Sequence, residues 1–196
     1  MPASTFDQIL ARGVRQGQIP ARTSSARAWY RGAADKVSTT PRNLMQREKD
    51  RLVNKPAVGS MYAFFYDPKT KAKLPYYDRF PLIFPIGGAP DGFMGINMHY
   101  LPYQLRARLM DALYSITNNK KYDESTKLKI SYNILNSASK FKLFRPTIKR
   151  YLNEKVKSRF LFINPTEWDI AIFLPVERFS KASKEVVFNA SRKMVS

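Results

Sequence analysis

The centre of the chain reads Met61-Tyr-Ala-Phe-Phe-Tyr-Asp-Pro-Lys69, then Leu74-Pro-Tyr-Tyr-Asp-Arg-Phe-Pro-Leu-Ile-Phe-Pro-Ile86, and then Gly92-Phe-Met-Gly-Ile-Asn-Met-His-Tyr-Leu-Pro102. Aromatic residues and prolines crowd this central block, and its titratable residues do not have the spacing of a metal site or a catalytic site. Solution chemistry usually needs clustered titratable side chains. The central block therefore indicates a buried scaffold or a docking surface, which points to assembly rather than catalysis.

The apolar residues of the block follow the two-residue period of β-strands. Along residues 61–66 two sets of side chains alternate, and Asp67-Pro-Lys-Thr70 predicts the turn of a hairpin. Pro81 and Pro85 each remove a ladder donor, which favours an edge strand or a strand end over residues 79–86. Further strands are expected at residues 93–99, 160–163 and 169–174.

Helical spacing of apolar residues predicts the other elements. Helices are expected at residues 6–14, at 25–37, from Pro41 onward, at 101–117, from Asp123 onward and at 147–160. The predicted fold class is α+β, with a small antiparallel β-sheet or barrel and inserted helices. Residues 59–196 are expected to form a single globular domain, and residues 1–58 a basic, extended N-terminal arm with short helices that orders on a partner.

The 196 residues carry a formal net charge of +19, which favours a polyanion or an acidic protein as partner. The chain has no cysteine, so disulfides, thiolate metal sites and cysteine nucleophiles are excluded. No apolar run is long enough to span a membrane, and the N-terminus lacks the pattern of a secretory signal, so we expect a soluble protein.

The second half of the chain holds the denser basic region. Residues 120–160 contain 12 basic and 3 acidic side chains, and five aromatic residues are interleaved with them. Such a region is what a phosphate-binding face requires, although the aromatic members can equally face the core. The candidate residues for binding nucleic acid or an acidic partner are Lys120, Lys121, Lys127, Lys129, Lys140, Lys142, Arg145, Lys149, Arg150, Lys155, Lys157 and Arg159. No motif that reads bases accompanies them.

Arginines and aromatic residues also recur in the first 31 residues, a combination favoured at protein interfaces. This segment can clamp a neighbouring subunit or follow nucleic acid, and a disordered tail is the other alternative. The candidate protein-interface residues are Arg12, Arg15, Arg22, Arg27, Trp29, Tyr30 and Arg31, together with Tyr76, Tyr77 and Arg79 of the central block.

Catalytic candidates are few. His99 is the sole histidine, and beside Met98 and Tyr100 we interpret it as structural. Asp67, Asp78 and Asp91 could hold a divalent metal, but Asp67 and Asp91 stand in turn sequences and Asp78 is next to Arg79. We therefore expect no enzyme, no metal and no cofactor, with a metal-dependent nuclease as the least favoured alternative.

The sequences Gly59-Ser-Met-Tyr-Ala-Phe-Phe-Tyr-Asp-Pro-Lys-Thr-Lys71, Leu74–Leu82 and Gly92–Pro102 resemble a conserved virion-associated protein of T4-like contractile-tailed phages, cyanophages among them. The resemblance continues more loosely through residues 137–150 and 168–179. It implies a small subunit of the neck or baseplate, or a protein that guards the end of the packaged DNA. No catalytic residue comes with it.

The leading hypothesis from the sequence is a non-enzymatic virion protein, present in several copies of a symmetric assembly, that links larger phage subunits through its arm and central block. The alternative is a sequence-independent DNA-binding protein at the packaged genome end. A single exposed face shared by the basic and aromatic side chains of residues 120–160 would favour DNA. In either case we expect assembly in the host cytoplasm and no contact with a membrane.

Overall fold

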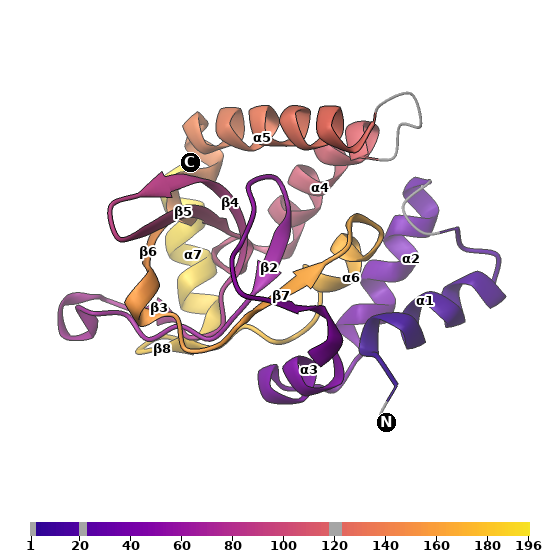
Figure 1. Ribbon diagram of the computed structural model, residues 1–196, viewed down its shortest axis with the longest axis horizontal. Coiled ribbons are helices and arrows are strands. Elements are labelled where there is room, and N and C mark those ends of the chain that lie inside the picture. Colours follow the sequence, from indigo (N-terminus) through magenta and orange to yellow (C-terminus); the bar gives the residue numbers. More distant parts are fainter. Residues whose placement is uncertain (1–2, 20–22, 118–122) are drawn as a thin grey trace.

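The computed structural model describes residues 3–19, 23–117 and 123–196, and it confirms a mixed α+β fold (Figure 1). The helices are α1 (Thr5–Arg15), α2 (Ser24–Asp35), α3 (Pro41–Arg47), α4 (Tyr103–Thr117), α5 (Glu124–Lys140), α6 (Trp168–Ala171) and α7 (Lys184–Val195). The strands are β1 (Leu52–Val53), β2 (Met61–Ala63), β3 (Tyr77–Asp78), β4 (Leu82–Ala89), β5 (Gly92–Asn97), β6 (Ile148–Leu152), β7 (Phe160–Ile163) and β8 (Phe179–Ser180).

Six strands form one antiparallel sheet in the order β1-β7-β2-β4-β5-β6, and β3 and β8 form a separate pair. The sheet is not a closed barrel, so the barrel alternative is wrong. The predicted hairpin is confirmed in its pairing, because β2 pairs antiparallel with β4, the next strand of this sheet along the chain, and the Tyr66 N–H donates to the Arg79 carbonyl. Its connection is longer than the predicted turn at residues 67–70, and β2 also pairs with β7. Beyond β2, Tyr66 bridges to Val156, which ties the chain after β2 to the connection between β6 and β7.

The predicted alternation along residues 61–66 is confirmed. Met61 and Ala63 belong to the main core, whereas Tyr62, Phe64 and Tyr66 belong to a second cluster. That second cluster is mostly aromatic: the Phe64 ring centroid lies 5.4 Å from that of Tyr151 and 4.9 Å from that of Phe160. The sheet therefore buries both of its faces, which explains why its strands are so rich in large side chains.

The N-terminal segment differs from the extended arm that the sequence predicted. Phe6, Tyr30 and Leu44, from α1, α2 and α3, are each at most 2% exposed and join the main core. Small residues allow this packing, since a Cβ added to Gly13 would come within 2.3 Å of the Tyr30 hydroxyl oxygen. A helix that packs through glycine and alanine looks poor in core residues, which is why the sequence suggested a tail.

Three further predictions are corrected. Residues 148–152 form strand β6 rather than a helix, because they complete the antiparallel ladder on β5. Residues 168–171 form the short helix α6 rather than a strand, and the helix is fully buried. Strand β4 is central rather than an edge strand; it accommodates Pro85 because β2 pairs only with Leu82 and Ile83, and a register irregularity follows Pro85.

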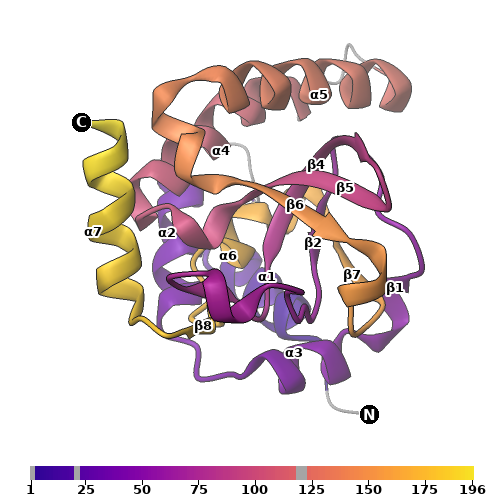
Figure 2. The same cartoon turned by 90° about the vertical axis from the view of Figure 1, so that its left-hand side faces the viewer.

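The predicted helices at residues 6–14, 25–37 and 101–117 and those beginning at Pro41 and near Asp123 are confirmed within a few residues at each end. The predicted strands at 93–99 and 160–163 correspond to β5 and β7. Figures 1 and 2 place α5 on one side of the sheet and the β3–β8 pair on the opposite side. Among the described helices, none has the length and apolar character needed to cross a membrane.

Candidate functional site

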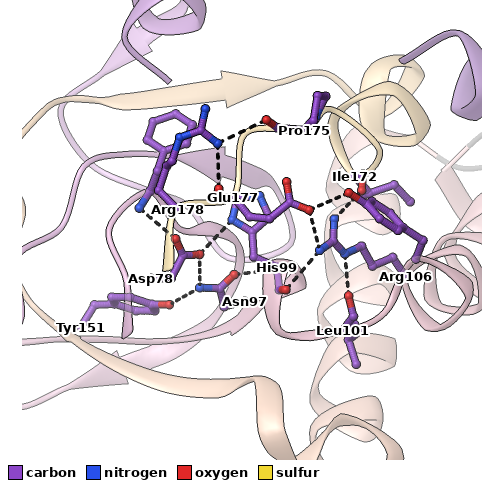
Figure 3. A network of polar contacts seen from close by, with 12 residues as sticks. Asp78, Asn97, His99, Leu101, Arg106, Tyr151, Ile172, Pro175, Glu177 and Arg178 are labelled. Atoms are coloured by element: carbon purple, nitrogen blue, oxygen red, sulfur yellow. Dashed lines mark hydrogen bonds and ion pairs between the residues drawn. The ribbon is translucent and has the colours of Figure 1, made fainter. Parts of the chain in front are cut away.

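A buried polar network lies where β3, β5 and β6 meet, and Figure 3 shows it. Asp78 Oδ2 accepts hydrogen bonds from Asn97 Nδ2 at 3.0 Å and from His99 Nδ1 at 2.8 Å. Asp78 Oδ1 accepts from the Phe80 backbone N–H at 2.9 Å, and Asn97 also donates to the Tyr151 hydroxyl. The network thus satisfies the Asp78 carboxylate and fixes three strands relative to one another. His99 has the structural position that the sequence predicted.

A second buried network adjoins the first and is centred on Arg106 of α4. The Arg106 side chain is 0% exposed and donates to the backbone carbonyls of Leu101 and Ile172 at 2.8 and 2.7 Å. Its guanidinium also lies 3.3 Å from Glu177 Oε1, which accepts from the Tyr103 hydroxyl at 2.7 Å. Burial raises the pKa of Glu177, but Arg106 and Tyr103 more than compensate and hold it at about 2.

The first network forms part of the wall of a surface cleft. This tyrosine cleft has a volume of about 380 Å³ and is lined by Tyr66, Pro68, Lys69, Thr70, Leu74, Tyr76, Tyr77, Asp78, Asn97, Tyr100 and residues 148–152. Five tyrosines and three cations line it, and Asp78 is the sole lining carboxylate among the described residues. Three cations against one carboxylate give the lining of the cleft a net positive charge.

A second cleft of about 520 Å³ adjoins the first, and the two share Tyr66. We call it the arginine cleft; it is lined by Thr40, Pro41, Arg42, Phe65, Tyr66, Asp67, Arg79, Phe80, Lys157 and Arg178. The β3–β8 pairing brings two of its arginines together, since the Arg79 backbone N–H donates to the Arg178 carbonyl at 2.8 Å. Asp67, the carboxylate in this lining, pairs at 2.8 Å with Lys71, which is not one of the four cations that line the cleft.

The comparison with protein families is decisive for identity. Residues 18–195 match the family model described as phage T4 terminal DNA protecting protein. The chain belongs to this family. No curated protein and no solved structure gives a significant match. Membership of the terminal DNA protecting family confirms, at the level of the family, the resemblance to a virion-associated protein of T4-like phages. The family's description favours the DNA-end alternative over the neck or baseplate linker.

The basic and aromatic residues that the sequence singled out are distributed over several surfaces and the core. Phe144 and Tyr151 are buried, whereas Phe141 is 62% exposed between the exposed Lys140 and Lys142. Residues 148–152 form strand β6 rather than part of an α-helix. The two clefts contain Lys149, Arg150 and Lys157. The exposed cations Lys129, Lys140, Lys142 and Arg145 lie on α5 and the following turn, on the opposite side of the sheet from the β3–β8 pair (Figure 2).

The other predicted basic residues have varied positions. Lys120 and Lys121 lie outside the described residues, and Lys127 lies in α5. Lys155 is half-buried 4.0 Å from Glu154, and Arg159 donates to Asn54 Oδ1 at 3.1 Å and to the Leu52 carbonyl.

The predicted interface residues of the N-terminal segment are used largely within the chain. Tyr30 is 2% exposed, and its hydroxyl donates to the Gln18 carbonyl at 2.9 Å. Arg31 bridges Asp169 at 2.6 Å and Asp111 at 2.8 Å, and Arg27 lies 3.3 Å from Asp111. These contacts anchor α2 on α4 and α6. Arg12 lies over the half-buried Trp29 ring, Arg15 is exposed, and Arg22 lies outside the described residues.

The three central-block residues proposed for an interface all line the clefts: Tyr76 and Tyr77 in the tyrosine cleft and Arg79 in the arginine cleft. Sequence reasoning missed Arg42 and Arg178, because α3 and β8 are far from the central block in sequence. It also missed Lys69, Tyr66 and Tyr100 as parts of a shared surface. The crowding of tyrosines in residues 62–77 was the available signal for the cleft.

The metal hypothesis for Asp67, Asp78 and Asp91 finds no support from the arrangement. Asp67 pairs with Lys71, Asp78 belongs to the His99 network, and Asp91 occupies the β4–β5 turn with a φ of 57°. Within the described ranges, no three acidic or histidine residues gather as a metal site would require.

Proposed function

We propose that this member of the terminal DNA protecting family binds the ends of double-stranded DNA without reading their sequence, and that it does so through its two adjoining clefts. The observation that carries the proposal is the charge of this surface. Seven lining cations meet two carboxylates, and both carboxylates are already paired within the chain. Among the described residues neither carboxylate forms an ion pair with a lining cation, so these cations can face the phosphates of a strand end, although Arg150 and Arg178 also donate to backbone carbonyls within the chain.

Phosphate contacts supply affinity and position but carry no sequence information, which suits a protein that must act on any end. Arg42, Arg79 and Lys157 are exposed, so they can follow a mobile phosphate backbone. Both clefts lie at one side of the sheet, near the β3–β8 pair, rather than along an extended face. A localised patch of this kind fits an end better than a long duplex segment.

The exposed cations on α5 and its following turn are a second surface for DNA or for an acidic neighbour in the virion. We assign it a supporting role, since in the described residues it lies apart from either cleft. We also propose that the protein acts by binding rather than by catalysis. Of the three aspartates that could have served a nuclease, Asp67 pairs with Lys71, Asp78 bonds to His99 and Asp91 lies in a turn.

The test compares a short open-ended duplex with a dumbbell of the same sequence whose ends are closed by hairpins. Fluorescence anisotropy across a salt series gives the affinity for each. We expect tighter binding to the open-ended duplex, with affinity falling steeply as salt rises. Equal affinity for both molecules would contradict the proposal.

A charge-matched pair of variants assigns the effect to the cleft. The triple variant Arg42→Glu, Arg79→Glu and Lys157→Glu should lose the preference for open ends. The control triple variant Lys36→Glu, Arg108→Glu and Lys193→Glu changes the net charge by the same amount at exposed positions outside both clefts. It should bind more weakly overall and keep the preference. An unchanged preference in the cleft variant would overturn the assignment.

A further inference from the structure

The tyrosine cleft contains a cation whose surroundings differ from those of an ordinary surface lysine. Lys149 is half-buried, and its Nζ lies 4.2 Å from the centroid of the Tyr100 ring. Among the described residues no carboxylate comes within ion-pair distance of it. Burial lowers the pKa of its ammonium group. A cation held in this way is offset only in part by the aromatic ring, and an anion entering the cleft would supply the missing partner.

The register of the sheet places Lys149 in the cleft. Lys149 pairs with Gly95 and Tyr151 pairs with Phe93, so the two β6 side chains fall on the same face of the strand. Tyr151 is locked by Asn97, as Figure 3 shows. The Tyr151 side chain beside Lys149 is therefore held by a hydrogen bond, and the half-buried Lys149 side chain packs over the Tyr100 ring.

The remaining walls offer aromatic surface. Tyr76 and Tyr77 are half-buried, so part of each ring faces the cleft that both residues line. The Tyr76 ring centroid lies 6.1 Å from that of Tyr100, the ring over which Lys149 sits. A ligand that carries both an anion and a flat aromatic group could therefore place the anion near Lys149 and the aromatic group against the tyrosine rings. The volume of about 380 Å³ lies near the lower end of the range for small-ligand sites.

We propose that the tyrosine cleft binds a single nucleotide, with its phosphate on Lys149 and its base against Tyr76 and Tyr77. The nucleotide is the 5′-phosphorylated terminal residue of a DNA strand, separated from its partner. This inference rests on the proposed function and extends it, because it names the chemical group that distinguishes an end from internal duplex.

Two observations favour a terminal nucleotide over an internal one. The cleft shares Tyr66 with the arginine cleft, so the phosphates that follow the terminal nucleotide can continue over Arg79 and Lys157. Unpairing costs less at an end, where a base pair has one stacking neighbour instead of two, and stacking on aromatic side chains compensates for lost stacking in the duplex.

The first experiment measures the affinity of the full chain for duplexes that differ only in carrying a 5′-phosphate or a 5′-hydroxyl at each end. We expect the phosphorylated ends to bind more tightly. Lys149→Gln should weaken binding to phosphorylated ends by about tenfold, as expected for loss of a charge-assisted contact, and should remove the difference between the two ends. Lys149→Arg, which keeps the positive charge, should retain much of the preference for phosphorylated ends. The control Lys193→Gln, at an exposed position of α7 outside both clefts, should leave the preference for phosphorylated ends unchanged.

Tyr76→Leu gives a separate readout, because it removes a stacking surface and keeps the charge. It should weaken binding to both kinds of end and leave the preference for phosphate intact. If Lys149→Gln binds both ends as the native chain does, the assignment of the phosphate to this cleft is overturned.

A second experiment separates this inference from the proposed function. Deoxyadenosine monophosphate and deoxyadenosine are titrated into the native chain while the NMR signal of the Lys149 side chain is followed. Deoxyadenosine monophosphate should raise the Lys149 pKa, and deoxyadenosine should not. Such a response without any preference for DNA ends would identify a free nucleotide as the ligand and overturn the terminal-nucleotide assignment. End preference with no response at Lys149 would leave the proposed function standing and overturn the cleft assignment alone.

Discussion

At the scale of single residues, Arg106 stabilises the buried loops that position the polar network beside the tyrosine cleft. Its guanidinium is fully buried and donates to the carbonyls of His99 and Leu101, in the segment after β5, and of Ile172, after α6. Glu177 supplies the compensating charge. A buried cation with this many backbone acceptors fixes the loops that follow β5 and α6, and these loops position His99 and β8.

Arg106→Met should therefore destabilise the protein strongly. The change leaves Glu177 buried without its partner and three carbonyls without a donor, so we expect a loss of about 3–5 kcal/mol in the free energy of unfolding. Chemical denaturation followed by circular dichroism measures it. Arg108→Met is the matched control, since Arg108 is an exposed residue of the same helix and should change stability by less than about 0.5 kcal/mol. Equal effects at the two positions would contradict the role of the buried network.

The same network predicts a dependence of stability on pH. The folded state holds the pKa of Glu177 at about 2, below its ordinary value of 4.5. A lowered carboxyl pKa contributes stability above the unfolded-state pKa, and that contribution is lost as the pH falls through the folded-state value. The free energy of unfolding should therefore fall between about pH 5 and pH 2, by up to about 3 kcal/mol from this group. Denaturation at several pH values tests this, and Glu177→Gln should flatten the curve. Parallel curves for the two proteins would show that Glu177 is not responsible.

Single residues differed in how well the sequence revealed them. The isolation of His99 in sequence correctly indicated a structural role. Asp78 was paired in our prediction with its neighbour Arg79, but its partners are Asn97 and His99, since the β4–β5 hairpin returns the chain to β3. Such pairings depend on strand register, which local sequence does not specify.

At the scale of elements, the β4–β5–β6 ladder positions the cations of the tyrosine cleft. Gly92 begins β5 directly after the turn and lies opposite Leu152. A Cβ added there would approach the Tyr151 carbonyl oxygen to 1.8 Å, so only glycine lets β6 lie this close. The position of Lys149 and Tyr151 thus depends on a residue that never touches the cleft.

Gly92→Ala should push β6 away from β5 and cost about 1–3 kcal/mol or more in the free energy of unfolding. Gly88→Ala in the same hairpin is the control, because an added Cβ there meets nothing within 4 Å. Thermal denaturation compares the two variants with the native chain. A similar midpoint for both variants would contradict the close approach of the two strands.

Elements with a strong local signal were predictable. Helices α1, α2, α4 and α5 repeat apolar residues at helical spacing, and β2 alternates two sets of side chains. Strand β6 was mistaken for a helix, since Ile148, Tyr151 and Leu152 also satisfy helical spacing when the partner strand is unknown. Helix α6 was mistaken for a strand because the apolar run over residues 170–174 is too short for its periodicity to separate a buried helix from a buried strand.

At the scale of the whole molecule, the N-terminal helices are part of the folded body rather than a detachable arm. They contribute Phe6, Ile9 and Leu44 to the main core. Arg51 reinforces the attachment by pairing with Asp7 of α1 at 3.2 Å and with Glu167 at 2.5 Å. Removing residues 1–47 should therefore expose the core and yield a destabilised, aggregating chain. Size-exclusion chromatography and thermal denaturation measure this. A stable monomer with an unchanged melting temperature would restore the arm hypothesis.

The overall charge of +19 favoured a polyanion or an acidic protein as partner, and membership of a family described by the protection of DNA ends agrees with the first of these. The location of the clefts was not predictable. They join residues from α3, the segment around β3, β6 and β8, and only the β3–β8 and β5–β6 pairings bring these together. The sequence favoured a continuous basic face over residues 120–160, whereas the sheet separates α5 from the β3–β8 pair.

The most direct test of the central claim is protection of DNA ends against a 5′→3′ exonuclease. A linear duplex with 5′-phosphates is incubated with the native chain, with the triple variant Arg42→Glu, Arg79→Glu and Lys157→Glu, or with the control Lys36→Glu, Arg108→Glu and Lys193→Glu, and digestion is followed over time. We predict that the native chain and the control delay digestion and that the cleft variant does not. Equal protection by the cleft variant, or digestion at the same rate with and without the native chain, would contradict the account.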